Sequence, residues 1–504
     1  MNTEKGTVQK LRDIFSTMLV FKDPAKSKFF SSLSIPSYLR DWLVMKFSDE
    51  NGSIDYAVAS DYVKQNIPRK EHWELLKSDM IKSGKTVRFL GKLRVEIDVT
   101  TGGAFFTLPD LGFPSRKQQA FIDDQVLRTQ RDSLLSSAET WGILECEWRP
   151  EGFSGKPSSG AVIMVGFRPF RPYQVDLEYF CQARAQFTLA EWIDLLLMAI
   201  DYNPAGFADE AEKFTMLSRL LPFLEKRVNL VELAPKGTGK SYLFSQISKY
   251  GWLVSGGSIS RARLFFDISK KSVGLMTRYD YVAFDEIQTI HFPDVDEMRG
   301  ALKGYLESGN YSIGDYRGVG DAGLVLMGNI PGYQMDENRN MFTELPIAFQ
   351  ESAMIDRFHG FIKGWQIPRM RENMKARGWS LNVEYFSEIL HALREEIRYR
   401  AIVDELIQVP KGSDTRDTEA IKRLATAFVK LLFPNVSSVA DVDCQEFEQF
   451  CLKPAMEMRK TIRTQLHLMD REYSPCLPMI EMKNQGNDTG SLTTRLQDTA
   501  EPVV

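Results

Sequence analysis

The chain has 504 residues, of which 43% are hydrophobic and 11% aromatic, and a formal net charge of −4 at pH 7. A chain of this length and apolar content can bury about three cores, so we expect a globular protein of several domains. The weakly acidic balance excludes a uniformly basic surface. Any contact with nucleic acid would have to come from a local patch or from a positive channel formed on assembly.

The cysteines and the lack of long apolar segments indicate in which part of the cell the protein is expected. The five cysteines are widely separated and include no CxxC pair, which is typical of reduced thiols and not of a structural zinc site. The N-terminus has no apolar signal region, and no run of about 18 uncharged apolar residues occurs. We expect a cytoplasmic protein that has no membrane partner.

The spacing of apolar residues changes along the chain and divides it into five regions. Apolar residues at three and four spacing predict a helical N-terminal domain, and the alternation that follows predicts a β-rich domain with a hairpin turn at Gly102-Gly103. Thr188 and Glu191 form a capping box at a helix that opens an α/β core. A mainly helical region and a polar tail, expected to be disordered, follow. The predicted bounds are 1–84, 85–184, 185–375, 376–475 and 476–504.

A glycine-rich turn separates a predicted strand from a predicted helix in "VNLVELAPKGTGKSYLF". Backbone amides surround a phosphate only in unusual dihedral angles, which glycine adopts readily, and the N-terminus of the next helix adds partial positive charge. The sequence therefore predicts a Walker A loop for ATP, with Lys240 at the β- and γ-phosphates and the Ser241 hydroxyl on Mg²⁺. Ala234 replaces the first glycine of the usual pattern. The residues expected to contact the nucleotide are Pro235, Lys236, Gly237, Thr238, Gly239, Lys240, Ser241 and Tyr242.

Two more apolar strands end in polar residues that suit ATP hydrolysis. The strand "YDYVAFDE" ends in Asp285, which can hold Mg²⁺ through water, and Glu286, which can polarise the attacking water. The strand "GLVLMGNI" carries Asn329, where a sensor 1 residue that orients this water would lie. For each segment alone, an ordinary polar turn is the alternative. Together with the Walker A loop, the strands predict a P-loop ATPase core with a parallel sheet and flanking helices.

Three arginines further along are candidates for transition-state charge. ATPases of this type often reach the γ-phosphate of a neighbouring subunit with an arginine finger, for which Arg357 in "DRFHG" is the candidate. Arg369 in "IPRMR" is the candidate second sensor, and Arg371 is nearly as plausible. A surface ion pair is the alternative for each of them.

These motifs together resemble the AAA+ ATPases and, more closely, the BrxL family of BREX phage-defence systems, a Lon-like ATPase family. The similarity extends over about residues 30 to 375 and includes "YFCQARAQFTLAEWIDLLLMAIDYNP", "LVSGGSISRARLFF" and "IDRFHGFIKGWQIPR". It implies a core similar to that of MCM helicases, a hexameric ring or a double ring (dodecamer), DNA binding, and work beside other phage-defence proteins. Relatives carry a Lon-like C-terminal domain. No serine in 380–504 has a setting that suits a Ser–Lys dyad, so we expect no Lon protease domain here.

The resemblance also suggests where DNA would bind. In such relatives a helix and a β-hairpin inserted before sensor 1 project into the central pore, and residues 298–323 are the matching segment. Turns are expected at Gly314-Asp315 and over Gly318 to Gly320. A solvated hairpin with an incidental arginine is the alternative. If the hairpin lines a pore, three side chains would contact the phosphates or stack on the bases of duplex DNA: Lys303, Tyr311 and Arg317.

Two main hypotheses for the function remain. The first is a ring-forming ATPase that binds duplex DNA in a central pore and couples ATP hydrolysis to DNA binding or translocation in antiviral defence. The second is a protein-remodelling ATPase that serves a protease. Its aromatic pore loop would have to come from Leu264, Phe265 and Phe266, which are more typical of the buried face of a helix. A signalling ATPase that senses phage components is a third possibility.

Overall fold

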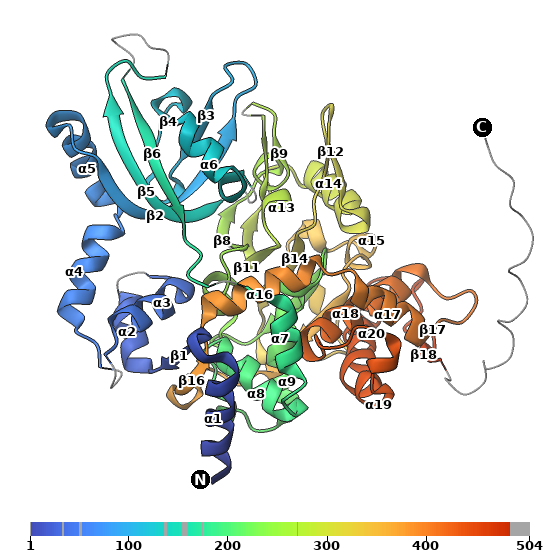
Figure 1. Cartoon of the computed structure of the whole chain (residues 1–504). Helices are drawn as coiled ribbons and strands as arrows, with labels where there is room; N and C mark the ends of the chain where they lie inside the picture. Colours follow the sequence, from blue (N-terminus) through green and yellow to red (C-terminus); the bar gives the residue numbers. More distant parts are fainter. Residues whose placement is uncertain are drawn as a thin grey trace, which may run out of the picture.

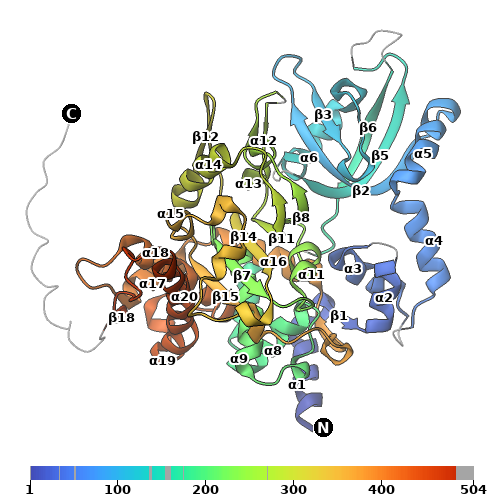
Figure 2. The same cartoon turned by 180° about the vertical axis from the view of Figure 1, so that it is seen from behind.

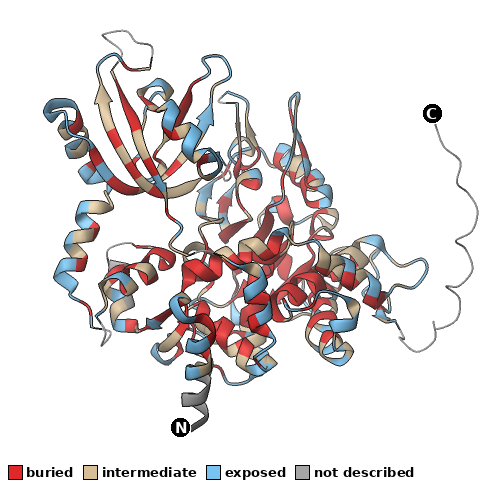
Figure 3. Cartoon of the chain, viewed as in Figure 1, coloured by how far each residue is buried: buried red, intermediate tan, exposed pale blue. Residues whose placement is uncertain are grey.

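The computed structural model describes residues 2–32, 35–49, 53–135, 139–153, 160–173, 175–269 and 271–483. Figure 1 shows a β-barrel at the top left, a central α/β core and a group of C-terminal helices at the right. Buried residues are concentrated in the central sheet, in the helices packed on it and inside the barrel (Figure 3).

A five-stranded sheet forms the centre of the core. Its strand order is β15-β7-β14-β11-β8, and every neighbouring pair is parallel. β7 is buried along its whole length, as an apolar strand covered on both faces should be. The order places the carboxyl ends of β7, β14 and β11 next to one another, where ligands bind in sheets of this class. The strands are β7 Leu230–Ala234, β8 Gly251–Ser258, β11 Tyr281–His291, β14 Gly323–Asn329 and β15 Gly360–Lys363.

Helices before and between these strands complete the core and confirm the predicted α/β class. The predicted capping box is also confirmed, because Thr188 accepts from the Glu191 amide and Glu191 accepts from the Thr188 amide. The helices are α7 Leu177–Arg184, α8 Leu189–Ala199, α9 Glu210–Leu217, α10 Leu221–Leu224, α11 Lys240–Gln246, α12 Arg261–Leu264, α13 Leu275–Arg278, α14 Val295–Ser308 and α15 Ser352–Ile355.

Two short hairpins interrupt the core and lie against each other. One is β9 Phe266–Asp267 with β10 Ser272–Val273, and the other is β12 Asn310–Ile313 with β13 Tyr316–Val319. The Phe266 and Tyr316 rings stack with centroids 3.6 Å apart, which joins the two hairpins. Both reach the upper side of the molecule in the two opposite views of Figures 1 and 2.

The β-rich region is a closed barrel with the strand order β2-β3-β4-β6-β5. β4 and β6 are parallel, the other pairs are antiparallel, and α6 lies between β4 and β5. This is the topology of the OB fold, a five-stranded barrel that often binds oligonucleotides. The predicted turn at Gly102-Gly103 does join two antiparallel strands. The elements are β2 Val87–Ile97, β3 Ala104–Thr107, β4 Ala120–Ile122, α6 Asp124–Leu135, β5 Thr140–Arg149 and β6 Ala161–Pro169.

The first helices do not form the separate domain that the sequence suggested. Phe15, Phe30 and Leu39 are fully buried in the same apolar cluster as the core helices α8 and α16 (Val383–Glu395). β1 also pairs with β16, so the N-terminal segment is part of the core, and only α4 and α5 lead away to the barrel. The elements are α1 Asn2–Phe15, β1 Leu19–Lys22, α2 Pro24–Ser32, α3 Ser37–Phe47, α4 Tyr56–Asn66, α5 Lys70–Ser83 and β16 Gly378–Leu381.

The C-terminal region is mainly helical, and the start of the predicted disordered tail is ordered. β18 pairs with β17, which fixes Glu481 and Met482 against Gln408 and Ile407. The rest of the tail, 484–504, lies outside the described residues. In the described part of the chain, no helix is both long and apolar enough to cross a membrane. The elements are α16 Val383–Glu395, α17 Arg398–Leu406, β17 Ile407–Gln408, α18 Thr415–Leu432, α19 Cys444–Phe447, α20 Lys453–Met469 and β18 Glu481–Met482.

Candidate nucleotide site

The predicted Walker A loop joins the end of β7 to the start of α11. Gly237 and Gly239 have φ values of +85° and +79°, which residues with a side chain rarely adopt. A Cβ at Gly237 would meet nothing within 4 Å, so the space beside the loop is open at this residue. Ala234, the departure from the usual pattern, fits because Gly364 faces it: a Cβ on Gly364 would lie 2.3 Å from that of Ala234.

Side chains from α11 and from the neighbouring strands β11 and β14 meet beside this loop. The Lys240 ammonium donates to Asn329 Oδ1 at 2.9 Å, and the Ser241 hydroxyl donates to the Asp285 carboxylate. Burial lowers the pKa of Lys240, and the nearby Arg219 lowers it further. An anionic group in the loop would offset both effects by favouring the charged ammonium. The structure thus brings together Lys240, Ser241, Asp285 and Asn329, as the sequence predicted.

Glu286 follows Asp285 but faces solvent. Its backbone has φ +48°, unusual for a residue with a side chain, and its amide donates to Asp285 Oδ1 at 3.0 Å. This turn separates the buried Asp285 from the exposed Glu286. The predicted strand ended at this pair, whereas β11 continues to His291 after a break in its pairing with β8.

A buried ion pair under the loop was not predicted. The Arg219 guanidinium binds both carboxylate oxygens of Glu232, at 2.6 and 3.0 Å, and both side chains are fully buried. Arg219 also donates to the carbonyl and hydroxyl oxygens of Thr238, at 2.8 and 3.1 Å. The pair therefore fixes the loop from below. Glu232, a lone carboxylate within an apolar strand, was the one sequence sign of it.

The candidate second sensors, Arg369 and Arg371, lie in a segment that contacts the phosphate loop. The Met370 amide donates to the Gly237 carbonyl at 2.8 Å, which places the residues on both sides of Met370 near the loop. Arg369 and Arg371 are exposed and form no ion pair with another described residue. Both arginines are therefore candidates, since each is next to Met370 in the sequence.

Arg357 lies at the opposite end of the sheet from the loop. It lies three residues before the start of β15, which is parallel to β7, whereas the loop follows the end of β7. Its guanidinium Nε lies 2.8 Å from Glu307 Oε2 on α14. Arg357 therefore does not reach the nucleotide site of its own chain, and only a neighbouring chain could use it as a finger.

The hairpin residues behave differently from what the sequence suggested. Tyr311 is only 4% exposed, and its hydroxyl lies 2.9 Å from that of Thr277, so the prediction that its ring stacks on DNA bases is wrong for this structure. Its ring occupies the space over Gly318, where a Cβ would lie 2.4 Å from it. Gly318 is thus a strand residue that makes room for this ring, not part of the predicted turn. Lys303, on α14, is paired with Glu351, and only Arg317 is exposed without an ion pair among the described residues.

The segment needed by the protein-remodelling hypothesis is also buried. Leu264 and Phe265 are fully buried, and Phe266 is covered on one face by Tyr316. Residues 264–266, all of which the structure describes, therefore do not form an exposed aromatic pore loop.

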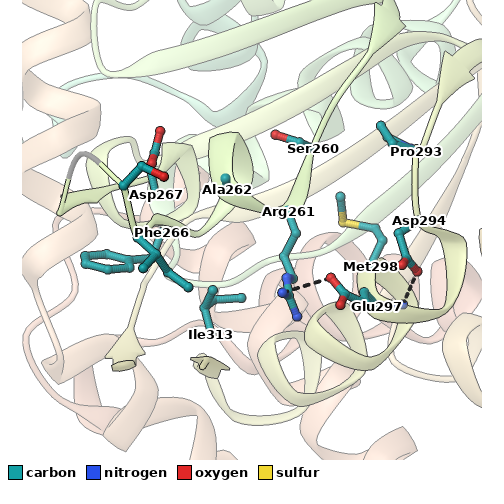
Figure 4. A pocket seen from close by; sticks show the side chains of 12 residues that line it. Ser260, Arg261, Ala262, Phe266, Asp267, Pro293, Asp294, Glu297, Met298 and Ile313 are labelled. Carbon is teal, nitrogen blue, oxygen red and sulfur yellow. Dashed lines mark hydrogen bonds and ion pairs between the residues drawn. The ribbon is translucent and has the colours of Figure 1, made fainter. Parts of the chain in front are cut away.

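Two cavities are relevant to ligand binding. A hollow of about 290 Å³ between α12, the first hairpin and α14 contains the ion pair of Arg261 with Glu297 (Figure 4). It shares no lining residue with the phosphate loop, so it is not the nucleotide site. A second cavity of about 380 Å³ touches the loop at Gly239.

Comparison with known proteins agrees with this geometry. The family model "Lon-like protease BrxL-like, ATPase domain" matches residues 162–477, and "BREX system Lon protease-like protein BrxL N-terminal" matches residues 13–148. The chain is 28% identical over 463 residues to the "Lon-like protease BrxL" of Escherichia coli O9:H4 (strain HS). It is 29% identical over 468 residues to the protein of the same name from Bacillus cereus (strain H3081.97).

The matches cover 90% and 91% of this chain but 64% and 66% of the two relatives. The chain therefore spans about two thirds of the length of these curated relatives. The ATPase-domain match includes the phosphate loop, the five-stranded sheet and the C-terminal helices up to α20. The chain belongs to the BrxL family of Lon-like ATPases.

Proposed function

We propose that this chain hydrolyses ATP and uses the reaction in a DNA-binding ring. The observation that carries the ATPase part is the meeting of Lys240, Ser241, Asp285 and Asn329 at the carboxyl end of a parallel sheet, beside an open glycine loop. An ammonium, a hydroxyl, a carboxylate and an amide in this arrangement suit phosphoryl transfer to water.

The residues of the chain have separate roles in this reaction. Backbone amides of the loop and the Lys240 ammonium bind the phosphate oxygens and stabilise their negative charge. Glu286, exposed at the turn after Asp285, polarises the attacking water and accepts its proton, and Asn329 orients that water. The oxygens of Ser241 and Asp285 already touch and are the hard ligands that Mg²⁺ prefers. Bound there, Mg²⁺ would neutralise charge on the β- and γ-phosphates.

The place of Arg357 is the basis on which we propose assembly. Because this arginine lies at the far end of the sheet from its own loop, a transition-state contact requires a second copy. We propose a closed hexameric ring, or two stacked rings, in which Arg357 of one subunit faces the phosphates held by the next. Glu307 would release Arg357 when the neighbour binds nucleotide.

Support for DNA as the partner comes from the hairpins and the barrel. The two hairpins lie together on one side of the molecule, and their exposed Arg317 and Lys271 add positive charge there. Repeated around a ring, these charges could contact the phosphates of duplex DNA despite the acidic total. The barrel has the topology of a fold that often binds oligonucleotides.

The biological process in which this activity takes part is proposed from the family match. The N-terminal match is to a family named for BREX systems, so we place this activity in antiviral defence, in the cytoplasm and beside other defence proteins. The buried Leu264 and Phe265 argue against the protein-remodelling alternative.

A single assay tests the proposal. Phosphate release from ATP is measured for the purified full chain, with and without duplex DNA. We expect Mg²⁺-dependent release that EDTA stops and DNA raises. A protein that releases no phosphate would contradict the ATPase part. One that neither binds duplex DNA nor releases phosphate faster in its presence would contradict the DNA part.

A further inference from the structure

Arg357, the candidate arginine finger, shares its surroundings with a second arginine. Its side chain borders a cavity of about 230 Å³ at the far end of the sheet from the phosphate loop. Glu307 on α14 and Arg416 on α18 line the same cavity. The three side chains come from separate parts of the chain, so tertiary packing brings them together.

The backbone around Arg357 is fixed by a C-terminal helix. Arg459 on α20 is fully buried and donates to the carbonyl oxygens of Asp356 and Phe358, at 2.9 and 2.6 Å. It also binds the Asp356 carboxylate at 2.7 Å. Because these two residues lie on either side of Arg357, a movement toward a neighbouring subunit has to come from the Arg357 side chain.

The Arg357 side chain is held against its own chain by an ion pair and a hydrogen bond. Its Nε lies 2.8 Å from Glu307 Oε2, and a terminal nitrogen donates to the Ala353 carbonyl oxygen. The guanidinium must therefore leave Glu307 before it can reach a phosphate held by the next subunit.

Glu307 has a second cationic partner. Arg416 donates to its two carboxylate oxygens, at 3.0 and 3.3 Å, and to Asp356 Oδ2 at 2.9 Å. When Arg357 leaves, Glu307 therefore keeps an ion pair made through both of its oxygens. Without Arg416, the same movement would leave the Glu307 carboxylate with no cation among the described residues, which is unfavourable for a partly buried charge.

We propose that Arg416 is a positioning residue for the arginine finger: by pairing with Glu307, it lowers the free energy needed to release Arg357 toward the nucleotide of the next subunit. This inference rests on the proposed ATPase ring and extends it, because it gives a residue of the C-terminal helices a role in hydrolysis at another subunit's site. Arg416 acts through Glu307 and does not itself contact the phosphates.

Arg416→Gln in the full chain removes this second cation. Glu307 then has Arg357 as its one cationic partner, so the finger is released less often. We expect kcat to fall by about fivefold and KM for ATP to change by less than about twofold, because Arg416 lies at the far end of the sheet from the phosphate loop of its own chain. Phosphate release at increasing ATP concentrations measures both constants.

A second substitution separates this role from structural support. Glu307→Gln removes the carboxylate that retains Arg357, so this protein should have at least the wild-type kcat. When Arg416→Gln is added to Glu307→Gln, kcat should change by less than about twofold, because no carboxylate charge is left for Arg416 to neutralise. Damage to the packing of α18 would instead lower kcat whether or not Glu307 is present.

Arg400→Gln is the matched control. Arg400 on α17 also binds both oxygens of a glutamate, Glu419, at 2.7 and 3.0 Å, and Glu419 keeps Arg423 as a partner at 2.7 Å when Arg400 is replaced. We expect the wild-type kcat and KM. A fall in kcat equal to that of Arg416→Gln would attribute the effect to any ion pair lost from these helices and would overturn the inference.

Two results for Arg416→Gln would overturn the inference while leaving the ATPase proposal intact: the wild-type kcat, or a loss of kcat that Glu307→Gln does not restore. If Arg416→Gln alone does not fold, Glu307→Gln and the double variant decide, since neither contains an unpaired Glu307 charge. Equal kcat values at or above that of the wild type would support the inference, and a lower kcat in either protein would overturn it. A wild-type protein that releases no phosphate would instead overturn the proposed function itself.

Discussion

At the residue scale, Glu286 is the side chain on which turnover depends most directly. It is exposed beside the buried Asp285, so Glu286→Gln keeps the shape of the site and removes only the base. We expect nucleotide affinity to remain and the hydrolysis rate to fall by about 10²–10⁴-fold. Phosphate release and equilibrium binding of ATP measure the two effects. Glu405→Gln, an exposed glutamate on α17, is the matched control and should be fully active.

The buried pair of Arg219 and Glu232 allows stability to be separated from binding. Glu232→Gln alone leaves the Arg219 charge without its partner and should lower the free energy of unfolding by about 3–5 kcal/mol. The double change Arg219→Met with Glu232→Leu should recover most of this loss. It should still weaken nucleotide binding, because Thr238 no longer receives hydrogen bonds from below. Equal nucleotide affinity in the double variant and the wild type would show that the pair does not position the loop.

How far the sequence predicts this site depends on how local each contact is. Lys240, Asp285 and Asn329 could be found because local sequence marks each of them: a glycine loop precedes Lys240, and apolar strand residues precede Asp285 and Asn329. Parallel strands then bring these positions together. Arg219 could not be found, because its partners Glu232 and Thr238 are fixed only by tertiary packing. Tyr311 was misassigned for a related reason: strand residues alternate between faces, and the sequence does not show which face of a short hairpin is covered.

At the scale of elements, Arg317 should act through its charge and Tyr311 through its packing. Arg317→Ala should weaken DNA binding, reduce the slope of log affinity against log salt by about 1, and leave the thermal midpoint unchanged. Tyr311→Ala should lower the free energy of unfolding by about 3–5 kcal/mol. DNA binding at several salt concentrations and thermal unfolding measure these effects. Lys460→Ala removes one exposed charge from α20, far from the hairpin, and should keep the wild-type DNA affinity.

His359 makes the central sheet sensitive to acid. Its Nδ1 accepts the Asn229 amide at 2.9 Å, and Asn229 Oδ1 accepts the Leu324 amide, which ties β15, β7 and β14 together. Burial, followed by the charges of Arg423 and Arg459, lowers the pKa of His359 well below its usual 6.5. Below pH 6.5, His359 takes up a proton in the unfolded chain but stays neutral in the folded chain. Stability is therefore full above pH 6.5 and falls as the pH drops, by up to about 1.4 kcal/mol per pH unit.

Unfolding measured between pH 7.5 and 5.5 tests this dependence on His359. His359→Asn keeps an acceptor for the Asn229 amide but cannot take up the proton, so its stability should fall less steeply with acid. His72→Asn changes an exposed histidine and should keep the wild-type slope. If the His359→Asn protein lost stability as steeply as the wild type, another group would be responsible.

At the scale of the whole molecule, the separation of Arg357 from its own phosphate loop makes complementation between subunits the decisive observation. An Arg357→Ala subunit keeps its acceptor site and lacks the finger, whereas a Glu286→Gln subunit keeps the finger and lacks the base. Each protein alone should hydrolyse almost no ATP. In a mixed ring, every Arg357→Ala site that faces a Glu286→Gln neighbour is complete, so random mixing in equal amounts should restore about a quarter of the wild-type rate.

A second mixture supplies the control for this experiment. Lys240→Ala and Glu286→Gln both damage the acceptor site, and both keep Arg357, so no arrangement of these two subunits creates a complete site. We expect this mixture to stay inactive at every ratio, while the Arg357→Ala mixture shows its highest activity near equal proportions. Activity of Arg357→Ala alone, or equal inactivity of both mixtures in rings shown to exchange subunits, would mean that the nucleotide site of this protein is completed within one chain or by a different arginine.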